Sequence, residues 1–407
     1  MLSFSQGSFK NVFALGSVSL LTDISREMIF PLLPLYLTSV LGAGTAFVGL
    51  VEGIAESTSS ILNIISGWLS DKIRKRKTLM LWGYGLSAVT RPLIAVATAG
   101  WHILLVRFVE KVGKGVRVPP RDALIAESCT AENRGRGFGL HRSMDNVGSV
   151  VGPLLAFSLL AWLGNDYRLL FWIAAIPAFL GLTILFFFVA EQVRSVSTDG
   201  PPDRKKLFDL KQFNRNFKVF LGITALFELA NSSNAFLLLR VKDIGLSVEL
   251  VPIIYLFANI FRTLSSLPGG ILSDKLGRRN MLALGWVIYG FSYLGFALAA
   301  SVMQAWVIFG IYGLFSGMTE GIKKALVADL VPQENRGAAY GLHSFVSSFI
   351  QLPASLMLGI LWQMHGPLLA FSMGAGLAMA AGCLLMLFIP ARSSTGEDVE
   401  NSQKRSS

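Results

Sequence analysis

Ionisable side chains recur at helical spacing within long apolar stretches of this 407-residue chain. They form three groups: Asp23, Arg26 and Glu27; Glu52 and Glu56; and Arg107, Glu110, Lys111 and Lys114. Steps of three and four residues place the members of each group on one face of a helix. A carboxylate in a partly desolvated site has a raised pKa, and a nearby cation lowers it again. Movement of a cation relative to such a carboxylate would therefore load and release a proton.

The stretches around these charges are long enough to span a bilayer. Of all residues 53% are hydrophobic and 15% are charged, whereas about a quarter are charged in a typical soluble domain. A transmembrane helix needs about 20 mostly apolar residues. Twelve stretches qualify: 11–40, 46–69, 78–99, 101–122, 137–163, 168–190, 218–239, 249–271, 280–301, 303–324, 338–362 and 366–390. The sequence predicts an all-α membrane protein of twelve transmembrane helices, which excludes a soluble enzyme with one core.

A charge at the centre of a transmembrane helix costs about 2.5–3.5 kcal/mol, so we expect the charged groups to be paired and to face a cavity. Asp145 in the fifth span joins this expected proton-coupling network. Arg91 and Arg142 are expected either to pair with these acids or only to fix helix packing.

Positive charges gather in alternate loops, which indicates the orientation in the membrane. The opposite loops hold only Arg168, Arg240 and Lys242. Because Lys and Arg concentrate on the cytoplasmic side, we expect both termini in the cytoplasm and a multi-pass protein of the inner (plasma) membrane. The net charge of +11 then reflects orientation, and nucleic-acid binding is not expected.

Motifs for other kinds of chemistry are missing from the sequence. Cys129 and Cys383 are the two cysteines, too few for a disulfide scaffold or a zinc cluster. The chain has no G-x4-G-K-[ST] loop for ATP and no HExxH pair for a metal. We therefore expect no enzymatic activity, no cofactor and no metal site. The N-terminus also lacks a signal-peptide cleavage pattern.

The chain contains an internal repeat. Asp71 and Asp274 lie in matching segments 203 residues apart, and Arg134 and Arg336 lie in matching segments 202 residues apart. We therefore expect two pseudo-symmetric six-helix halves, 1–190 and 218–390, joined by a cytoplasmic linker at 191–217 and followed by a tail at 391–407. Repeated halves with a site between them are typical of alternating-access transporters.

The loop after the second span carries a signature. Gly67, Asp71 and Arg74 fall within GWLSDKIRKRK, and Gly270, Asp274 and Arg278 fall within GILSDKLGRR. Both segments resemble G-x-L-[SA]-D-R-x-G-R-[RK] of the major facilitator superfamily, although Arg74 stands where that family usually has glycine. The resemblance implies the twelve-helix fold of that family and a monomer. A carboxylate here could bind the N-terminus of a neighbouring helix or an arginine and hold one face closed.

The fifth span carries a second signature. Gly139, Gly148, Gly152 and Pro153 follow G-x8-G-x3-G-P, which resembles the drug:proton antiporter branch of that superfamily. In the fourth span, Arg107 to Gly113 partly resembles the family pattern R-x-x-Q-G-x-G, in which the arginine is implicated in proton coupling. Glu110 and Lys111 depart from that pattern. The antiporter resemblance slightly favours export over import.

The two halves differ in charge. At the repeat offset, Tyr255, Asn259 and Ser347 match Glu52, Glu56 and Asp145. We expect the first half to couple protons and both halves to hydrogen-bond the substrate. The expected substrate cavity comprises Lys114, Glu228, Asn231, Asn234, Tyr255, Asn259 and Arg262. Lys323 and Lys324 are expected at the membrane interface, and His141 and His343 are expected to be structural.

The sequence therefore predicts a proton-coupled secondary transporter of a small polar or charged organic solute, working by alternating access. Its expected partners are this solute, protons and the lipid bilayer. One alternative is a proton-coupled importer of an anionic solute or of a metal chelate such as a siderophore. Another is a membrane sensor that does not transport, and a third is a passive channel.

Overall fold

The computed structural model describes residues 6–73, 75–129, 133–191, 210–332 and 335–390. In the first half, the long helices are α1 (Gln6–Ile29), α3 (Thr45–Ile73), α4 (Arg76–Ala95), α5 (Gly100–Glu127), α6 (Arg134–Trp162) and α7 (Tyr167–Phe188). The short helix α2 (Leu33–Leu35) and the π-helical turn η1 (Tyr36–Val40) continue α1. No strand occurs in these ranges.

The second half begins with the 3₁₀ turn η2 (Leu210–Gln212). It continues with α9 (Arg215–Ala230), α10 (Ala235–Asp243), η3 (Val248–Leu250), α11 (Val251–Leu276), α12 (Arg278–Leu298), α13 (Val302–Leu330) and α14 (Arg336–Phe388). Gly366 interrupts α14 with φ +82°, a conformation that favours glycine. The two arms of α14 correspond to the last two predicted spans.

The predicted fold class is confirmed, and every predicted span overlaps a helix. Within the described ranges, six helical segments are long and apolar enough to cross a membrane: α6, α7, η3 with α11, α12, α13 and α14. The other long helices of the first half, α1, α3, α4 and α5, carry most of the ionisable groups that the sequence singled out. The charges on these four helices lower their mean hydropathy. The same charges form the polar interior described below.

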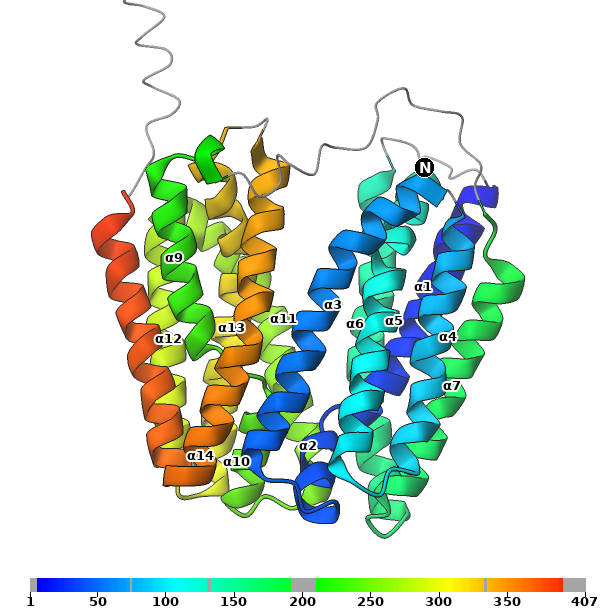
Figure 1. The fold of residues 1–407 in the computed structure, drawn as a ribbon, viewed down its shortest axis with the longest axis horizontal. Helices are drawn as coiled ribbons and strands as arrows, with labels where there is room; N and C mark the ends of the chain where they lie inside the picture. The colour runs from blue at the N-terminus through cyan, green and yellow to red at the C-terminus, as the bar shows by residue number, and fades with distance from the viewer. Residues whose placement is uncertain (1–5, 74, 130–132, 192–209, 333–334, 391–407) are drawn as a thin grey trace, which may run out of the picture.

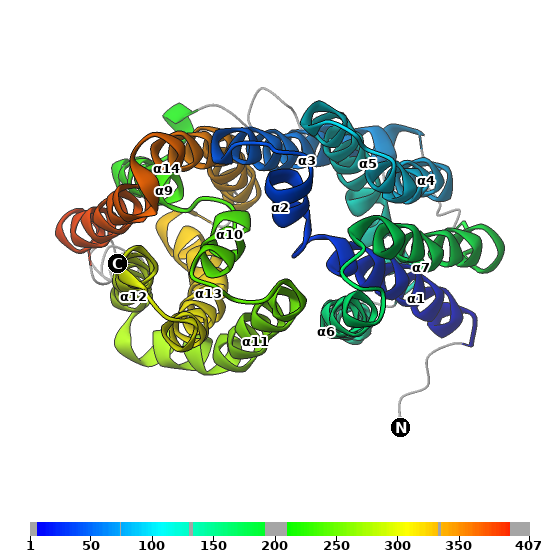
Figure 2. The same cartoon turned by 90° about the horizontal axis from the view of Figure 1, so that it is seen from below.

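The two halves stand side by side, the first on the right of Figure 1 and the second on the left. The starts of α1 and α9 and the ends of α7 and α14 lie along the same upper edge, as an even number of crossings in each half requires. Seen from the opposite edge, α3 runs beside α14, and α6 faces α11 (Figure 2).

Two spans are broken at matching places. The first span stops at Ile29 and resumes at Leu33, as Pro31 and Pro34 predict, since proline removes a helical donor and crowds the preceding turn. The seventh span stops at Ala230 and resumes at Ala235, although the sequence predicts one continuous helix over 218–239. Asn, Ser, Ser and Asn occupy this gap, and such side chains compete with the backbone for hydrogen bonds.

Aromatic packing holds the second break in place. Tyr289 donates to the Ala230 carbonyl at 2.8 Å, and the hydroxyls of Tyr293 and Ser232 lie 3.0 Å apart. Phe227 stacks on Trp286 with ring centroids 4.5 Å apart. These buried rings of α12 fix the end of α9, so the break is a packed feature of the fold.

Glycines bring α3 and α14 into backbone contact across the two halves. A Cβ atom on Gly53 would lie 2.8 Å from Leu352 Cα. The Thr45 hydroxyl donates to the Gly359 carbonyl at 2.9 Å, and the Ser57 hydroxyl donates to the Ser348 carbonyl at 2.9 Å. We call this contact, Thr45–Ser57 of α3 against Ser348–Gly359 of α14, the seam. It lies toward the edge opposite the termini (Figure 1).

Candidate functional site

A cavity of about 460 Å³ lies between the two halves. The first half contributes Phe30, Glu52 and Glu56 to its lining. The second half contributes most of the wall: Glu228, Asn231, Ser232, Ser233, Asn234, Arg262, Tyr312, Phe315, Ser316, Thr319, Glu320, Lys323, Lys324, His343, Ser344, Ser347, Ser348 and Gln351. A wall this polar suits a hydrophilic solute better than a hydrophobic one.

Behind Glu52 lies a buried cluster of ion pairs on α3, α4 and α5. Arg107 donates through Nη2 to both carboxylate oxygens of Glu52, at 2.9 and 3.1 Å, and through Nη1 to Glu110 at 2.6 Å. Arg91 approaches the other oxygen of Glu110 at 3.1 Å. Each side chain is at most 5% exposed. Two cations and two anions balance here, which is the condition for tolerating buried charge.

Glu56 forms a second pair with Lys111, one helical turn along both α3 and α5. The Glu56 side chain is 38% exposed and lines the cavity, whereas Lys111 is 5% exposed. Lys114, one turn further along α5, does not line this cavity, which differs from the predicted arrangement. Glu56 is therefore the member of the predicted network that most directly meets the contents of the cavity.

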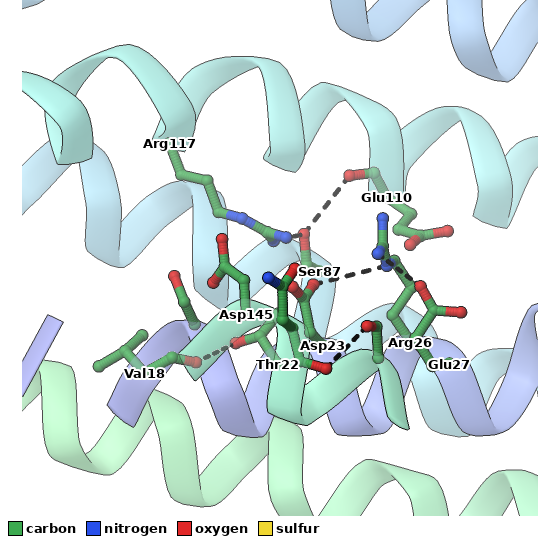
Figure 3. A network of polar contacts seen from close by, with 12 residues as sticks. Val18, Thr22, Asp23, Arg26, Glu27, Ser87, Glu110, Arg117 and Asp145 are labelled. Carbon is green, nitrogen blue, oxygen red and sulfur yellow. Dashed lines mark hydrogen bonds and ion pairs between the residues drawn. The ribbon is translucent and has the colours of Figure 1, made fainter. Parts of the chain in front are cut away.

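The remaining network residues lie on α1 and α6 (Figure 3). Arg26 contacts Glu27 at 2.5 Å and Asp23 at 3.5 Å. Asp145 of α6 lies 3.5 Å from Nδ1 of His141. The nine residues predicted as one charge network thus fall into four separate sets of direct contacts: Asp23, Arg26 and Glu27; Asp145 with His141; Glu52, Arg107 and Glu110; and Glu56 with Lys111.

The glycines of the fifth span bring α6 against α1 beside these acids. A Cβ atom on Gly148 would lie 3.0 Å from Asp23 Cβ, and one on Gly152 would lie 2.6 Å from Glu27 Cβ. Pro153 follows within the same helix. A Cβ atom on Gly139 would meet nothing within 4 Å. Close helix approach therefore explains two of the three glycines in the antiporter-like pattern.

Arg117 of α5 contacts two side chains of α4. Its Nη1 donates to Ser87 at 2.5 Å, and its guanidinium lies over the Tyr84 ring at 4.5 Å. Ser87 in turn donates to the Glu110 carbonyl at 3.4 Å, as Figure 3 shows. Ser87 of α4 therefore connects two residues that lie about two turns apart on one face of α5.

In the second half, ion pairs line the cavity directly. Lys323 donates to Glu228 at 2.9 Å, and Asn231 donates to the other oxygen of Glu228 at 2.9 Å. Arg262 donates to Glu320 at 2.6 Å. Lys323 and Lys324 thus line the cavity. The pairing with Glu228 of α9 accounts for the placement of Lys323.

The other predicted cavity residues fall in two places. Glu228, Asn231, Asn234 and Arg262 line the large cavity. Tyr255 and Asn259 line a small adjoining space together with Asn234 and Arg262. Tyr312, which the sequence analysis did not single out, donates to Asn234 at 2.7 Å.

Glu52 also links the first half to the broken helix of the second half. The Ser233 hydroxyl donates to Glu52 at 3.4 Å, and the Ser233 backbone N–H donates to Ser355 of α14 at 3.2 Å. One carboxylate thus accepts from Arg107 in its own half and from a serine in the other half. Any motion between the halves changes the environment of Glu52.

At the edge that bears the termini, a repeated ion pair joins neighbouring helices. Arg76 pairs with Glu127, and Arg278 pairs with Asp329 at 2.5 Å. The second pair repeats the first at the offset of 202 residues. This offset could have revealed Glu127 and Asp329 from the sequence. Arg278 also approaches the predicted partner Asp274 at 3.7 Å.

The turn of the second signature depends on glycine. Gly277 has φ +90° between α11 and α12, a conformation that only glycine adopts without strain. Gly270 and Gly67 lie within α11 and α3. The Asp71 side chain and Arg74 lie outside the described residues.

Glu191 is a carboxylate that binds a helix N-terminus, that of α4. Its two oxygens accept from the backbone N–H groups of Arg76 and Lys77, both at 2.8 Å. This satisfies donors that the first turn of α4 leaves unpaired. The sequence analysis missed Glu191 because it fell at the start of the predicted linker.

Comparisons with known proteins agree with this architecture. Residues 15–350 and 220–406 match the family model of the Major Facilitator Superfamily. An uncharacterized MFS-type transporter of Methanocaldococcus jannaschii is 38% identical, over 93% of this chain and 95% of its own length. The multidrug resistance protein MdtH of Cronobacter sakazakii is 25% identical, over 84% of each chain.

Solved structures share the fold at low identity. The nucleoside transporter NupG has a TM-score of 0.79 at 15% identity and covers 93% of this chain and 100% of its own. A bacterial homologue of the human lysosomal transporter Spinster, inward-facing and unoccupied, has a TM-score of 0.71 at 17% identity, with 95% and 96% covered. With its two helical halves around a polar cavity, the chain belongs to the major facilitator superfamily and is a multi-pass membrane transporter of that kind.

Proposed function

We propose that this transporter is a proton-coupled antiporter that exports a small polar organic solute by alternating access. The observation that carries the proposal is the polar cavity between the halves, into which Glu56 and Glu52 reach from an ion-paired interior. The solute occupies the cavity, and the carboxylates exchange protons when the halves move.

Glu52 supports the coupling because it is shared between the halves. Rocking of the second half separates Ser233 from Glu52 and leaves Arg107 as its principal partner. Such a change in hydrogen bonding alters the proton affinity of a carboxylate. The Glu56 side chain is 38% exposed, whereas that of Glu52 is 3% exposed. Closing of the cavity therefore changes the solvation of Glu56 more than that of Glu52.

The orientation follows from the positive-inside rule, with both termini in the cytoplasm and the protein in the plasma membrane. The seam then lies on the outer side, and the cavity reaches Lys323 and Lys324 toward the cytoplasmic ends of α13 and α14. This conformation is inward-facing, ready to take a solute from the cytoplasm.

Export is supported by the pattern Gly148, Gly152 and Pro153, and by the relative named as a multidrug resistance protein. Import of an anionic solute or a metal chelate is the second candidate, favoured by Arg262, Lys323 and Lys324 in the wall. The two candidates share one cavity and differ in direction.

The first experiment compares the metabolites of cells and medium between a deletion strain and its parent by untargeted mass spectrometry. Export predicts a compound that is retained in deletion cells and depleted outside. A compound left unused in the medium would instead support import. A non-transporting sensor predicts no difference under several growth conditions.

The second experiment tests coupling. Proteoliposomes that contain the full chain and an internal pH dye should show a proton flux when the compound found by mass spectrometry is added. An imposed pH gradient should drive its uphill movement. Solute movement that is indifferent to the gradient would refute proton coupling, and binding without counterflow would indicate a sensor.

A further inference from the structure

One face of α14 beside the cavity carries buried polar atoms that have no partner. His343 Nε2, Ser347 Oγ and Gln351 Oε1 are buried and have no hydrogen-bond partner among the described residues. All three residues line the cavity. Steps of four residues place them on one face, with a rise of about 6 Å per step and about 12 Å in all. We call this row the α14 ladder.

Buried polar atoms without partners are rare in folded proteins, so three in one row indicate missing hydrogen bonds. The ladder overlaps the start of the seam at Gln351, and Ser355, the next residue in the series, already has a partner because it accepts from the Ser233 backbone N–H at 3.2 Å. His343 is 9% exposed, and its ring stacks on Phe220 with centroids 6.0 Å apart and planes 13° apart. Stacking therefore fixes the imidazole end of the ladder.

The charges around the cavity leave one cation over. Glu52, Glu56, Glu228 and Glu320 each have a partner, namely Arg107, Lys111, Lys323 and Arg262. Lys324 lines the same cavity, and no ion pair of Lys324 occurs within the described part of the chain. An unpaired cation in a polar cavity favours an anionic solute.

We propose that the α14 ladder and Lys324 form the subsite for a polyhydroxylated anion, such as a sugar acid or a sugar-alcohol phosphate. Hydroxyl groups both donate and accept, so they satisfy the imidazole, the serine and either end of the glutamine amide. The anionic end binds Lys324. A hydrophobic cation would leave all three ladder atoms unmet, and a site built to hydrogen-bond strongly rejects a ligand that lacks the groups.

This proposal rests on the proposed transport function and names its substrate class. The test is binding to the purified full chain in lipid nanodiscs, measured by calorimetry without a pH gradient. The probes are D-gluconate and sorbitol 6-phosphate as polyhydroxylated anions, sorbitol as the neutral match, and hexanoate as the anion without hydroxyls. Gluconate or sorbitol 6-phosphate should bind at least tenfold more tightly than sorbitol and hexanoate. The better of the two identifies a carboxylate or a phosphate.

Variants locate the binding. Ser347→Ala and Gln351→Leu should each weaken binding of the better polyhydroxylated anion about tenfold, the effect of losing about 1.4 kcal/mol. Lys324→Gln should abolish the preference for that anion over sorbitol. Ser266→Ala, an exposed serine on α11 that bonds only its own helix, is the matched control and should bind like the native protein.

Three results would overturn the proposal: hexanoate binding as tightly as gluconate, no binding of either polyhydroxylated anion, or native affinity in both ladder variants. Because binding is measured without a gradient, it is independent of proton coupling. Binding together with transport that ignores a pH gradient would refute the coupling and keep the subsite. Coupled transport of a different solute would do the reverse.

Discussion

The two halves share a fold and a repeat but use their charges differently. In the first half, Arg107, Glu52 and Glu110 face one another in an almost closed cluster, with side chains at most 5% exposed. In the second half, Arg262 and Glu320 are 41% and 52% exposed and line the cavity. The two halves thus share a backbone plan, while the Arg107 cluster of the first half is closed and the Arg262–Glu320 pair of the second half is open to the cavity.

The largest expected effect comes from the closed cluster. Arg107→Leu leaves two buried carboxylates without their shared cation, and breaking a buried pair in this way costs about 3–5 kcal/mol. Thermal unfolding in detergent should show a clearly lowered midpoint. The comparison variant in the second half, Arg262→Leu, removes an exposed pair and should cost less than about 1 kcal/mol. Equal losses in both variants would refute the contrast between the halves.

Proton coupling should depend on Glu56 more than on Glu320. Glu56→Gln removes the titrating group that faces the cavity, so gradient-driven transport should fall at least tenfold while solute counterflow persists. Glu320→Gln should retain coupling. Asp243→Asn, at a side chain that is 52% exposed on α10, is the control for charge removal alone. Coupled transport at the native rate by Glu56→Gln would exclude Glu56 from the coupling step.

The seam should respond to added volume. Gly53→Val places atoms against the Leu352 backbone, and such overpacking typically costs about 1–3 kcal/mol. The conformation with a closed seam should lose population, which can be measured by the rate at which a cysteine at Ser57 is alkylated. Gly139→Ala, at a glycine with open space around it, should leave that rate unchanged. Unchanged alkylation in Gly53→Val would mean that the seam is looser than its contacts indicate.

The smallest effect is expected at the repeated pair near the termini. Arg278→Ala removes the contact with Asp329, whose side chain is 42% exposed, and exposed pairs contribute about 0.2–1 kcal/mol. The midpoint of unfolding should shift only slightly and should shift less at high salt. A large, salt-independent loss would show that this pair does more than join α12 to α13.

Much of the fold could be predicted from the sequence because its signals are local. Apolar length predicts the spans, and the offset between Asp71 and Asp274 predicts the two halves. The break at Asn231–Asn234 could not be predicted, because the surrounding stretch is apolar enough for one helix. It depends on packing against Tyr289 and Tyr293, which are distant in sequence.

The site was harder to predict for a similar reason. Spacing places residues on one face of a helix but does not say which helix that face meets. Glu110 was correctly placed on the face of Arg107, yet its second partner, Arg91, comes from another helix. Lys323 was expected at the membrane interface. Its pairing with Glu228 follows from tertiary packing, because the two residues lie on different helices. His343 was expected to be structural and Ser347 was noted only as the match to Asp145, so the row that they form with Gln351 was not predicted.

The position of the seam has a mechanical consequence. α3 is 29 residues long, and the seam holds the segment from Thr45 to Ser57. The remaining arm to Ile73 is about 24 Å long, at about 1.5 Å per residue. Pivoting this arm by about 10° would move its tip by about 4 Å. Because the seam holds the first part of α3, a small change of angle at its backbone contacts produces a larger displacement at the far end of the helix.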